Sequence, residues 1–161
     1  GGYEIKMSSV SVSRIREEEI PACAQIMAGN SLWQHYDVTY ESALARFQNG
    51  YSEQATIFIA HEGEEVCGFC WVAEKGAFNR SAYIMLIGVD PLRQSRGIGK
   101  ILLEETEKYL ATKSVDVFLT VSDFNIGAQK FYSGMGYKTV GEIPDYVKPG
   151  ITEIIMRKVL R

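Results

Sequence analysis

The sequence predicts an α/β protein in which one mixed β-sheet of about seven strands carries helices on both faces. Apolar runs of strand length recur along the 161-residue chain. Stretches with helical spacing of apolar residues separate several of these runs, and glycine-containing turns mark many of the boundaries. No repeat, low-complexity tract or linker divides the chain. We therefore expect one domain over residues 8–161, and we expect residues 1–7 to be an expression remnant or a disordered start.

The first half of the chain alternates between the two kinds of pattern. Three acidic residues open the first predicted helix, where they favour the positive end of its dipole. In the second helix Ala43, Leu44 and Phe47 share one face. The aromatic stretch "SLWQHYD" (31–37) has no clear period, and it could equally form an aromatic wall for a substrate or pack on the sheet. The predicted elements are strands at 10–15, 54–63 and 64–76, the last two as a hairpin, and helices at 17–30 and 39–51.

The second half continues with strands rich in β-branched and aromatic residues. A helix over 97–113 has its apolar stripe at Ile98, Ile101, Leu102 and Tyr109. A shorter helix over 125–136 ends at a glycine, as helices commonly do. The remaining predicted strands are 81–91, 114–123, 137–143 and 151–160.

Composition excludes several classes of protein. A net charge of −3 and a pI near 5.5 argue against a nucleic-acid partner. No apolar run approaches the roughly 20 residues of a membrane span. No signal-peptide pattern opens the chain. We expect a cytoplasmic protein without a membrane partner, as a monomer or homodimer.

The cysteines are interpreted as core residues. Cys67 and Cys70 have CxxC spacing but lie within a predicted strand, where residues three apart point to opposite faces. Only two histidines are available as further ligands, so we expect no metal site.

The segment "RQSRGIGK" (93–100) lies between a predicted strand and a predicted helix. It matches neither a Walker loop nor a dinucleotide fingerprint, because Gln94 and Leu102 stand where glycines are required. The first N–H groups of the helix lack intrahelical partners and, with the helix dipole, favour an anion such as phosphate. Gly97 and Gly99 would let that anion approach the backbone. An ordinary tight turn with solvated charges is the alternative.

The chain resembles the GNAT superfamily of acyl-CoA-dependent N-acetyltransferases from about residue 10 onward. Gln94-x-x-Gly97-x-Gly99 is similar to the family's pyrophosphate-binding motif, and "NIGAQKFYSGMGY" (125–137) is similar to its second motif. The resemblance implies a sheet splayed between its fourth and fifth strands. It also implies that the amide of Val89 polarises the acetyl carbonyl. The residues that it assigns to coenzyme A are Ile87, Gly88, Val89, Gln94, Ser95, Arg96, Gly97, Ile98, Gly99, Lys100, Asn125 and Tyr132.

The same resemblance makes Tyr132 the general acid that protonates the leaving thiolate; a core tyrosine is the alternative. For Asn125 the alternative is a helix N-cap, and one Asn can serve both roles. The closest motif similarity is to ribosomal-protein N-terminal acetyltransferases, in which a Glu five residues before the motif Asn is the base. Thr120 occupies that position here. The other groups weighed as bases are Asp123, Glu142, Asp145 and His35, and Tyr146 matches a tyrosine of the acceptor pocket.

The resemblance implies an enzyme that transfers acetyl from acetyl-CoA, its co-substrate, to a primary amine by direct attack in a ternary complex. The acceptor would be a small-molecule amine or a peptide or protein amine. A non-catalytic acyl-CoA sensor or scaffold domain is the alternative, favoured by Thr120 in place of Glu.

Overall fold

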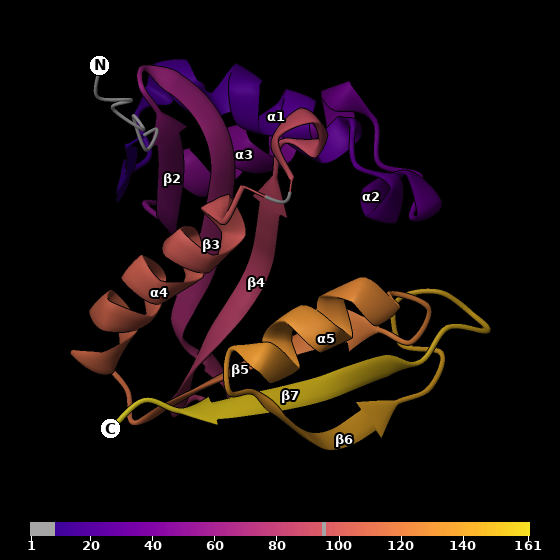
Figure 1. The fold of residues 1–161 in the computed structure, drawn as a ribbon. Helices are drawn as coiled ribbons and strands as arrows, with labels where there is room; N and C mark the ends of the chain where they lie inside the picture. The colour runs from indigo at the N-terminus through magenta and orange to yellow at the C-terminus, as the bar shows by residue number, and fades with distance from the viewer. Residues whose placement is uncertain (1–8, 95) are drawn as a thin grey trace, which may run out of the picture.

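The computed structural model describes residues 9–94 and 96–161, which form seven strands in one sheet (Figure 1). The predictions for residues 1–7 and for Ser95 lie outside the described residues. The strands are β1 Val10–Arg14, β2 Thr56–Glu62, β3 Glu65–Ala77, β4 Ser81–Val89, β5 Asp116–Ser122, β6 Lys138–Ile143 and β7 Glu153–Val159. The helices are α1 Ile20–Ala28, α2 Ser31–His35, α3 Tyr40–Ser52, α4 Ile98–Ala111 and α5 Ile126–Gly134, with 3-10 turns at Glu17–Glu19 and Pro91–Arg93.

The sheet has the order β1-β2-β3-β4-β5-β7-β6, so the last strand of the chain lies between β5 and β6. The pairing of β4 with β5 is parallel, and the other pairings within the described sheet are antiparallel. The predicted mixed sheet is therefore confirmed.

Helices cover both faces of the sheet, as the sequence predicts. On one face, buried side chains of α4 such as Leu102 and Leu110 pack with Tyr132 of α5. On the other face, side chains of α1, α2 and α3 pack around Phe69 and Trp71. The sheet between these two clusters is buried on both sides, which explains the nearly continuous apolar runs of β2 and β3.

The fourth and fifth strands splay apart, also as predicted. Within the described chain they pair at Ala82–Val117 and Tyr83–Phe118, and no pair is formed beyond. Figure 1 shows the two strands diverging from this point. The rest of β4 pairs with β3 alone, and a register shift between its Leu86 and Ile84 pairs leaves Met85 as an extra residue. The bulge lies where the strands separate, a position at which bulges commonly redirect a strand.

The aromatic stretch 31–37 contains a helix that the sequence did not predict. The side chain of Asn30 accepts a hydrogen bond from Leu32 N at 3.0 Å and caps α2. Trp33 is buried and stacks on Phe69, with ring centroids 5.6 Å apart. Of the two interpretations left open, Trp33 therefore follows the packing one. The short helix forms because its cap and its buried tryptophan offset a length that is marginal for an isolated helix.

The prediction that Cys67 and Cys70 point to opposite faces is wrong. Both are buried in the cluster beneath α4. Cys67 is the extra residue of a β-bulge between the pairs Ala60–Gly68 and His61–Val66, and this shift reverses the alternation. Burial raises the pKa of Cys67 to about 11 and that of Cys70 to about 12. Both thiols are therefore protonated at neutral pH.

Replacing Cys67 and Cys70 together by Ala should lower the free energy of unfolding by about 2 kcal/mol, because each change leaves a small cavity in a packed core. The acetyl transfer that the resemblance implies should stay unchanged in the folded protein, since neutral thiols are neither nucleophiles nor metal ligands. Denaturant unfolding and turnover would be measured side by side. Cys23→Ala, in the buried cluster on the other face of the sheet, is the matched control. Cys67→Ala alone is a second control, because Cys70 but not Cys67 acts on Tyr132. One equivalent of zinc in the purified protein would contradict this prediction.

Candidate active site

The turn before α4 has the backbone conformation that an anion cradle requires. Gly97 is the N-cap of α4 and has φ 75°, in the left-handed region that favours glycine. Gly97 has no side chain that could cap the helix, so the N-cap residue leaves the first N–H groups of α4 available. A Cβ built on Gly97 would meet no atom within 4 Å. Space next to these donors is therefore open.

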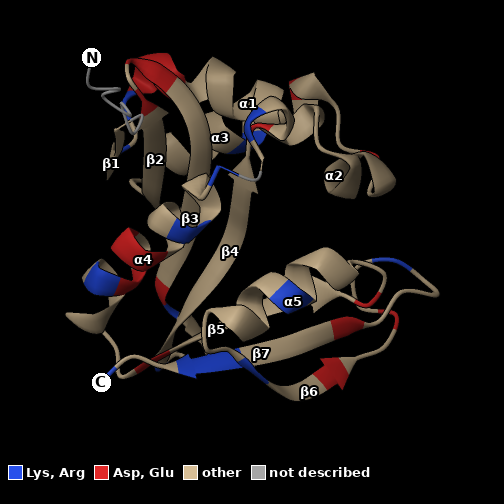
Figure 2. Ribbon diagram, in the orientation of Figure 1, with Lys and Arg blue, Asp and Glu red and all other residues tan. Residues whose placement is uncertain are grey.

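The cations of the turn face carboxylates. Arg93 and Arg96 each donate from Nη1 to Oε1 of Glu62 at 3.0 Å, and Arg93 also pairs with Glu65. The side chain of Arg96 is 56% exposed and that of Lys100 is 65% exposed, so both charges are largely solvated. Figure 2 shows basic residues on the segment between β4 and α4 and acidic residues on the turn between β2 and β3. An incoming anion would compete with Glu62 for Arg96.

Three segments that the resemblance assigns to coenzyme A meet at the opening of the splay. A Cβ on Gly99 of α4 would lie 3.6 Å from both Val89 Cγ2 at the end of β4 and Phe131 Cζ of α5. Ile87 and Val89 pack against the same buried cluster as Tyr132. The residues from β4, α4 and α5 are thus brought together. Gln94 follows the 3-10 turn and is exposed.

Gly88 is required by close packing. A Cβ at this position would lie 2.8 Å from both Phe69 and Trp33, closer than side chains tolerate. The backbone of β4 at Ile87–Val89 is therefore held by aromatic rings on one side. One edge of this segment pairs with β3. The opposite edge faces the splay, because these residues do not pair with β5. Unpaired strand edges of this kind can bind an amide-rich chain as an added strand does.

Asn125 caps helix α5, the role given above as the alternative. Its Oδ1 accepts a hydrogen bond from Ala128 N at 3.1 Å. The side-chain amide keeps its N–H donors for another partner, so the cap is compatible with the predicted contact to coenzyme A. That contact stays a prediction.

Tyr132 lies in the buried cluster beside the splay and is 8% exposed. Its ring lies 5.3 Å from that of Phe131 and 5.7 Å from that of Tyr137. Burial, with a smaller contribution from Cys70, raises the pKa of Tyr132 above its ordinary value of 10.0. The phenol is therefore fully protonated at neutral pH, which is the form that a proton donor needs.

The groups weighed as general bases are scattered. Glu142, Asp145 and His35 are exposed, and Asp145 Oδ1 accepts from Gly150 N at 2.7 Å within its own loop. Asp123 Oδ2 accepts from Thr152 N at 3.3 Å. Thr120 Oγ1 lies 3.4 Å from the hydroxyl of Tyr83 across the narrow end of the splay. The one carboxylate within β5 is Asp116 at the start of the strand, and it pairs with Arg157 at 2.7 Å.

A cluster that the sequence analysis missed lies two residues further along β5. The Tyr36 hydroxyl lies 2.6 Å from Ser122 Oγ and donates to Oε1 of Glu153 at 3.0 Å. Partial burial is the main cause that raises the pKa of Tyr36, and Glu153 adds to it. The one signal in the sequence was an acidic residue within the otherwise apolar run "ITEIIM".

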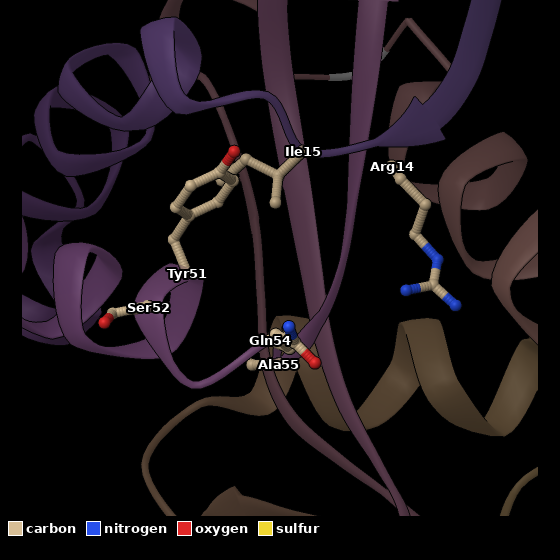
Figure 3. Close-up of a pocket in the computed structure, with 6 residues that line it drawn as sticks. All are labelled: Arg14, Ile15, Tyr51, Ser52, Gln54 and Ala55. Atoms are coloured by element: carbon tan, nitrogen blue, oxygen red, sulfur yellow. The ribbon is translucent and has the colours of Figure 1, made fainter.

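A separate shallow pocket lies at the β1 edge of the sheet, where the end of β1 meets the end of α3 (Figure 3). It is lined by Arg14, Ile15, Tyr51, Ser52, Gln54 and Ala55, none of which the sequence analysis assigned to the site. In Figure 3 the guanidinium of Arg14 points away from Tyr51. Its Cζ atom lies 5.1 Å from the ring centroid of Phe58 and 4.9 Å from that of Tyr109. We assign it no role in catalysis.

The fold of this chain, with a sheet that opens between parallel strands and a glycine-capped helix at the opening, is shared by solved acetyltransferases. A putative GNAT acetyltransferase from Desulfovibrio desulfuricans superposes with a TM-score of 0.80 at 17% identity, over 95% of this chain and all of the other. The S18-alanine ribosomal-protein N-acetyltransferase of Escherichia coli superposes at 0.74 with 19% identity, over 94% of each chain. An aminoglycoside 6'-N-acetyltransferase solved with coenzyme A gives 0.76 at 16% identity, over 94% and 97%.

The chain belongs to the acetyltransferase (GNAT) family, whose model matches residues 15–137. Curated relatives include the mycothiol acetyltransferase of Acidimicrobium ferrooxidans, 32% identical over 104 residues, which are 63% of this chain and 34% of that protein. That of Kineococcus radiotolerans is 26% identical over 99 residues, 62% and 32% of the two chains. The aligned region thus spans about a third of these relatives.

Two further observations concern the described residues. Among residues 9–94 and 96–161, no group of three or more His, Cys, Asp or Glu side chains is arranged to hold a metal ion. None of the helices in this part of the chain is long and apolar enough to span a membrane.

Proposed function

We propose that the protein transfers an acetyl group from acetyl-CoA to a primary amine by direct attack. The observation that carries the proposal is the meeting of Gly99, Val89 and Phe131 at the opening of the splay, next to a protonated Tyr132. Membership of the acetyltransferase family supports it, as do a neighbour solved with coenzyme A and another solved with acetyl-CoA. The N–H groups of the α4 N-terminus would hold the pyrophosphate, and Arg96 would add a charge-assisted contact.

The chemical roles follow from the positions of the groups. The neutral amine nitrogen attacks the acetyl carbonyl carbon, whose oxygen the Val89 amide N–H would polarise. A carbon–nitrogen bond forms, the carbon–sulfur bond breaks and the sulfur leaves as a thiolate. Tyr132 would give its proton to that sulfur, and the proton lost by the amine restores the phenol through the site or solvent. The similarity to ribosomal-protein acetyltransferases in particular remains a proposal, because the curated relatives are instead named mycothiol acetyltransferases.

An acyl-CoA-binding domain without turnover is the second candidate, and one observation favours it. Thr120 stands where the resemblance places a catalytic Glu. Its hydroxyl contacts the hydroxyl of Tyr83 and cannot replace the carboxylate as a base. Incubating the protein with acetyl-CoA and a panel of amines and peptide N-termini separates the two candidates. We expect acetylated amine by mass spectrometry together with free thiol. Tight acetyl-CoA binding without any acetylated product would support the binding domain.

A further inference from the structure

Glu153 is a buried carboxylate without a cationic partner. Four acidic side chains are buried in the described chain: Glu19, Glu107, Asp116 and Glu153. Glu107 pairs with Lys158 and Asp116 with Arg157, at 2.8 and 2.7 Å, and Glu19 contacts His61 and Arg16. Glu153 is 4% exposed and forms no ion pair with any described residue. Because an unpaired buried charge is costly, its presence calls for a compensating ligand.

The hydrogen bonds of Glu153 leave one of its oxygens free. Oε1 lies 3.0 Å from the hydroxyl of Tyr36 and 3.2 Å from that of Ser122, and the two hydroxyls lie 2.6 Å from each other. Tyr36 donates to Oε1 and Ser122 donates to Tyr36, because each hydroxyl has a single proton. Oε2 accepts no hydrogen bond from the described residues. Among the described residues, the fully buried side-chain oxygens without a hydrogen-bond partner belong to Glu62 and Asp116. Oε2 of Glu153 is not one of them, so it keeps some contact with solvent. One carboxylate oxygen is thus fixed by two neutral hydroxyls, and the other remains able to accept a charged donor.

The cluster lies on the acceptor side of the splay. Glu153 of β7 pairs directly with Ser122 of β5, so the two side chains share a face. Leu119 and Val121 of β5 point into the cluster beneath α4 and α5, so Thr120 and Ser122 face the other way. Thr120 is the position at which the resemblance expected the base. Glu153, which pairs with Ser122, therefore lies on the same face of the sheet as Thr120 and is its diagonal neighbour on the adjacent strand.

Aromatic rings border the cluster. The ring of Phe124, 43% exposed, lies 4.5 Å from that of His35 and 6.3 Å from that of Tyr36. Lys148 reaches the same rim, but its ammonium donates to the His35 carbonyl at 3.1 Å and lies 3.9 Å from Asp37. Figure 2 shows acidic residues at the adjoining ends of β6 and β7. A carboxylate beside aromatic faces is a favourable environment for an organic cation.

We propose that Glu153, Tyr36 and Ser122 form the subsite that binds the acceptor as an ammonium ion carried on an apolar or aromatic body. Glu153 supplies the charge, the two hydroxyls fix its orientation, and the rings of Tyr36 and Phe124 contact the body of the acceptor. The inference rests on the proposed function and names its substrate class. Glu153 is an acceptor-binding residue in this assignment, and anionic acceptors are excluded from the subsite by the same charge.

Binding of N,N-dimethylbenzylamine, a protonated tertiary amine that cannot yield a neutral amide, tests the subsite without turnover. Benzyl alcohol is its neutral counterpart. In the presence of coenzyme A, Glu153→Gln should weaken binding of the amine at least tenfold, the usual size of a lost charge-assisted hydrogen bond, and leave the alcohol unchanged. The side-chain carbonyl of Gln still accepts from the hydroxyl of Tyr36, so a merely structural role would survive the change. Glu142→Gln, at an exposed carboxylate of β6, is the matched control.

The results separate failure of the subsite from failure of the proposed function. Unchanged amine affinity in folded Glu153→Gln, or no binding to the wild type in the millimolar range, overturns the subsite. If Glu153→Gln does not fold, Tyr36→Phe should weaken the amine more than the alcohol, and equal effects overturn the proposal. A wild type that binds the amine through Glu153 but acetylates none supports the subsite while the proposed function fails. Where benzylamine is acetylated, we expect KM to rise in Glu153→Gln and acetyl-CoA affinity to stay constant.

Discussion

Gly97→Glu should abolish coenzyme A binding in a protein that remains folded. A Cβ at this position meets no atom of the described residues within 4 Å. The cost to the fold is about 1–2 kcal/mol for a residue other than glycine at φ 75°. The new carboxylate would lie over the N–H groups of α4 and oppose any phosphate there by charge and by bulk. Titration calorimetry with coenzyme A measures the loss.

Gly150→Glu is the matched control for this experiment. Gly150 has φ 85°, and a Cβ there also has no neighbour within 4 Å, so the strain and the added charge are alike, but it lies in the loop between β6 and β7. We expect its affinity for coenzyme A to stay close to that of the wild type. Near-normal affinity in folded Gly97→Glu would instead remove the cradle assignment. Salt should weaken wild-type binding only moderately, because Arg96 and Lys100 are more than half exposed and already screened.

Tyr132→Phe should slow acetyl transfer by about 10²- to 10⁴-fold, the usual contribution of general acid–base catalysis. The variant keeps the ring that packs against Phe131 and Tyr137 and removes only the hydroxyl. Affinity for acetyl-CoA should change little. Single-turnover measurement follows the chemical step even where product release limits kcat. Because burial raises the pKa of Tyr132 above 10.0, wild-type activity should show no loss from its ionisation below about pH 10.

Tyr137→Phe distinguishes a catalytic hydroxyl from a structural one. Tyr137 donates to Glu107 Oε2 at 2.7 Å, so this change should cost stability, by about 1–3 kcal/mol, without slowing the chemical step. The two tyrosines have adjoining rings in one buried cluster, which matches their environments closely. A chemical step in Tyr132→Phe within about twofold of the wild type would make that tyrosine structural, since such a loss lies far below the acid–base range.

The glycine-capped turn of the candidate site could be predicted because its information is local. Gly97 and Gly99 follow one another in a single strand-to-helix turn, and the backbone conformation that this turn needs is written into the residue types. The cap role of Asn125 follows from the same kind of short-range hydrogen bond. Strand and helix bounds agreed with the sequence pattern for the same reason, since periodic burial is a property of neighbouring residues.

Errors arose where one residue changed a register. The bulge at Cys67 reversed the alternation of β3 and brought Cys67 and Cys70 into one cluster, although their spacing predicted opposite faces. The bulge at Met85 marks the start of the splay, which the motif resemblance implied but the apolar run of β4 did not reveal. A bulge is chosen by pairing and packing between strands, so a single strand's pattern does not encode it.

By itself, the sequence determined the mixed α/β fold, the glycine-capped turn before α4 and the position of Tyr132 within a recognisable motif. Only the tertiary structure brought together the residues of the proposed acceptor subsite. Tyr36 meets Glu153 across 117 positions of sequence, and Glu153 meets Ser122 because the last strand lies between β5 and β6. Such contacts depend on long-range strand order and on helix α2 docking through Trp33. Local residue patterns cannot specify them, because the cost of closing the chain is offset only by the packing of the whole sheet.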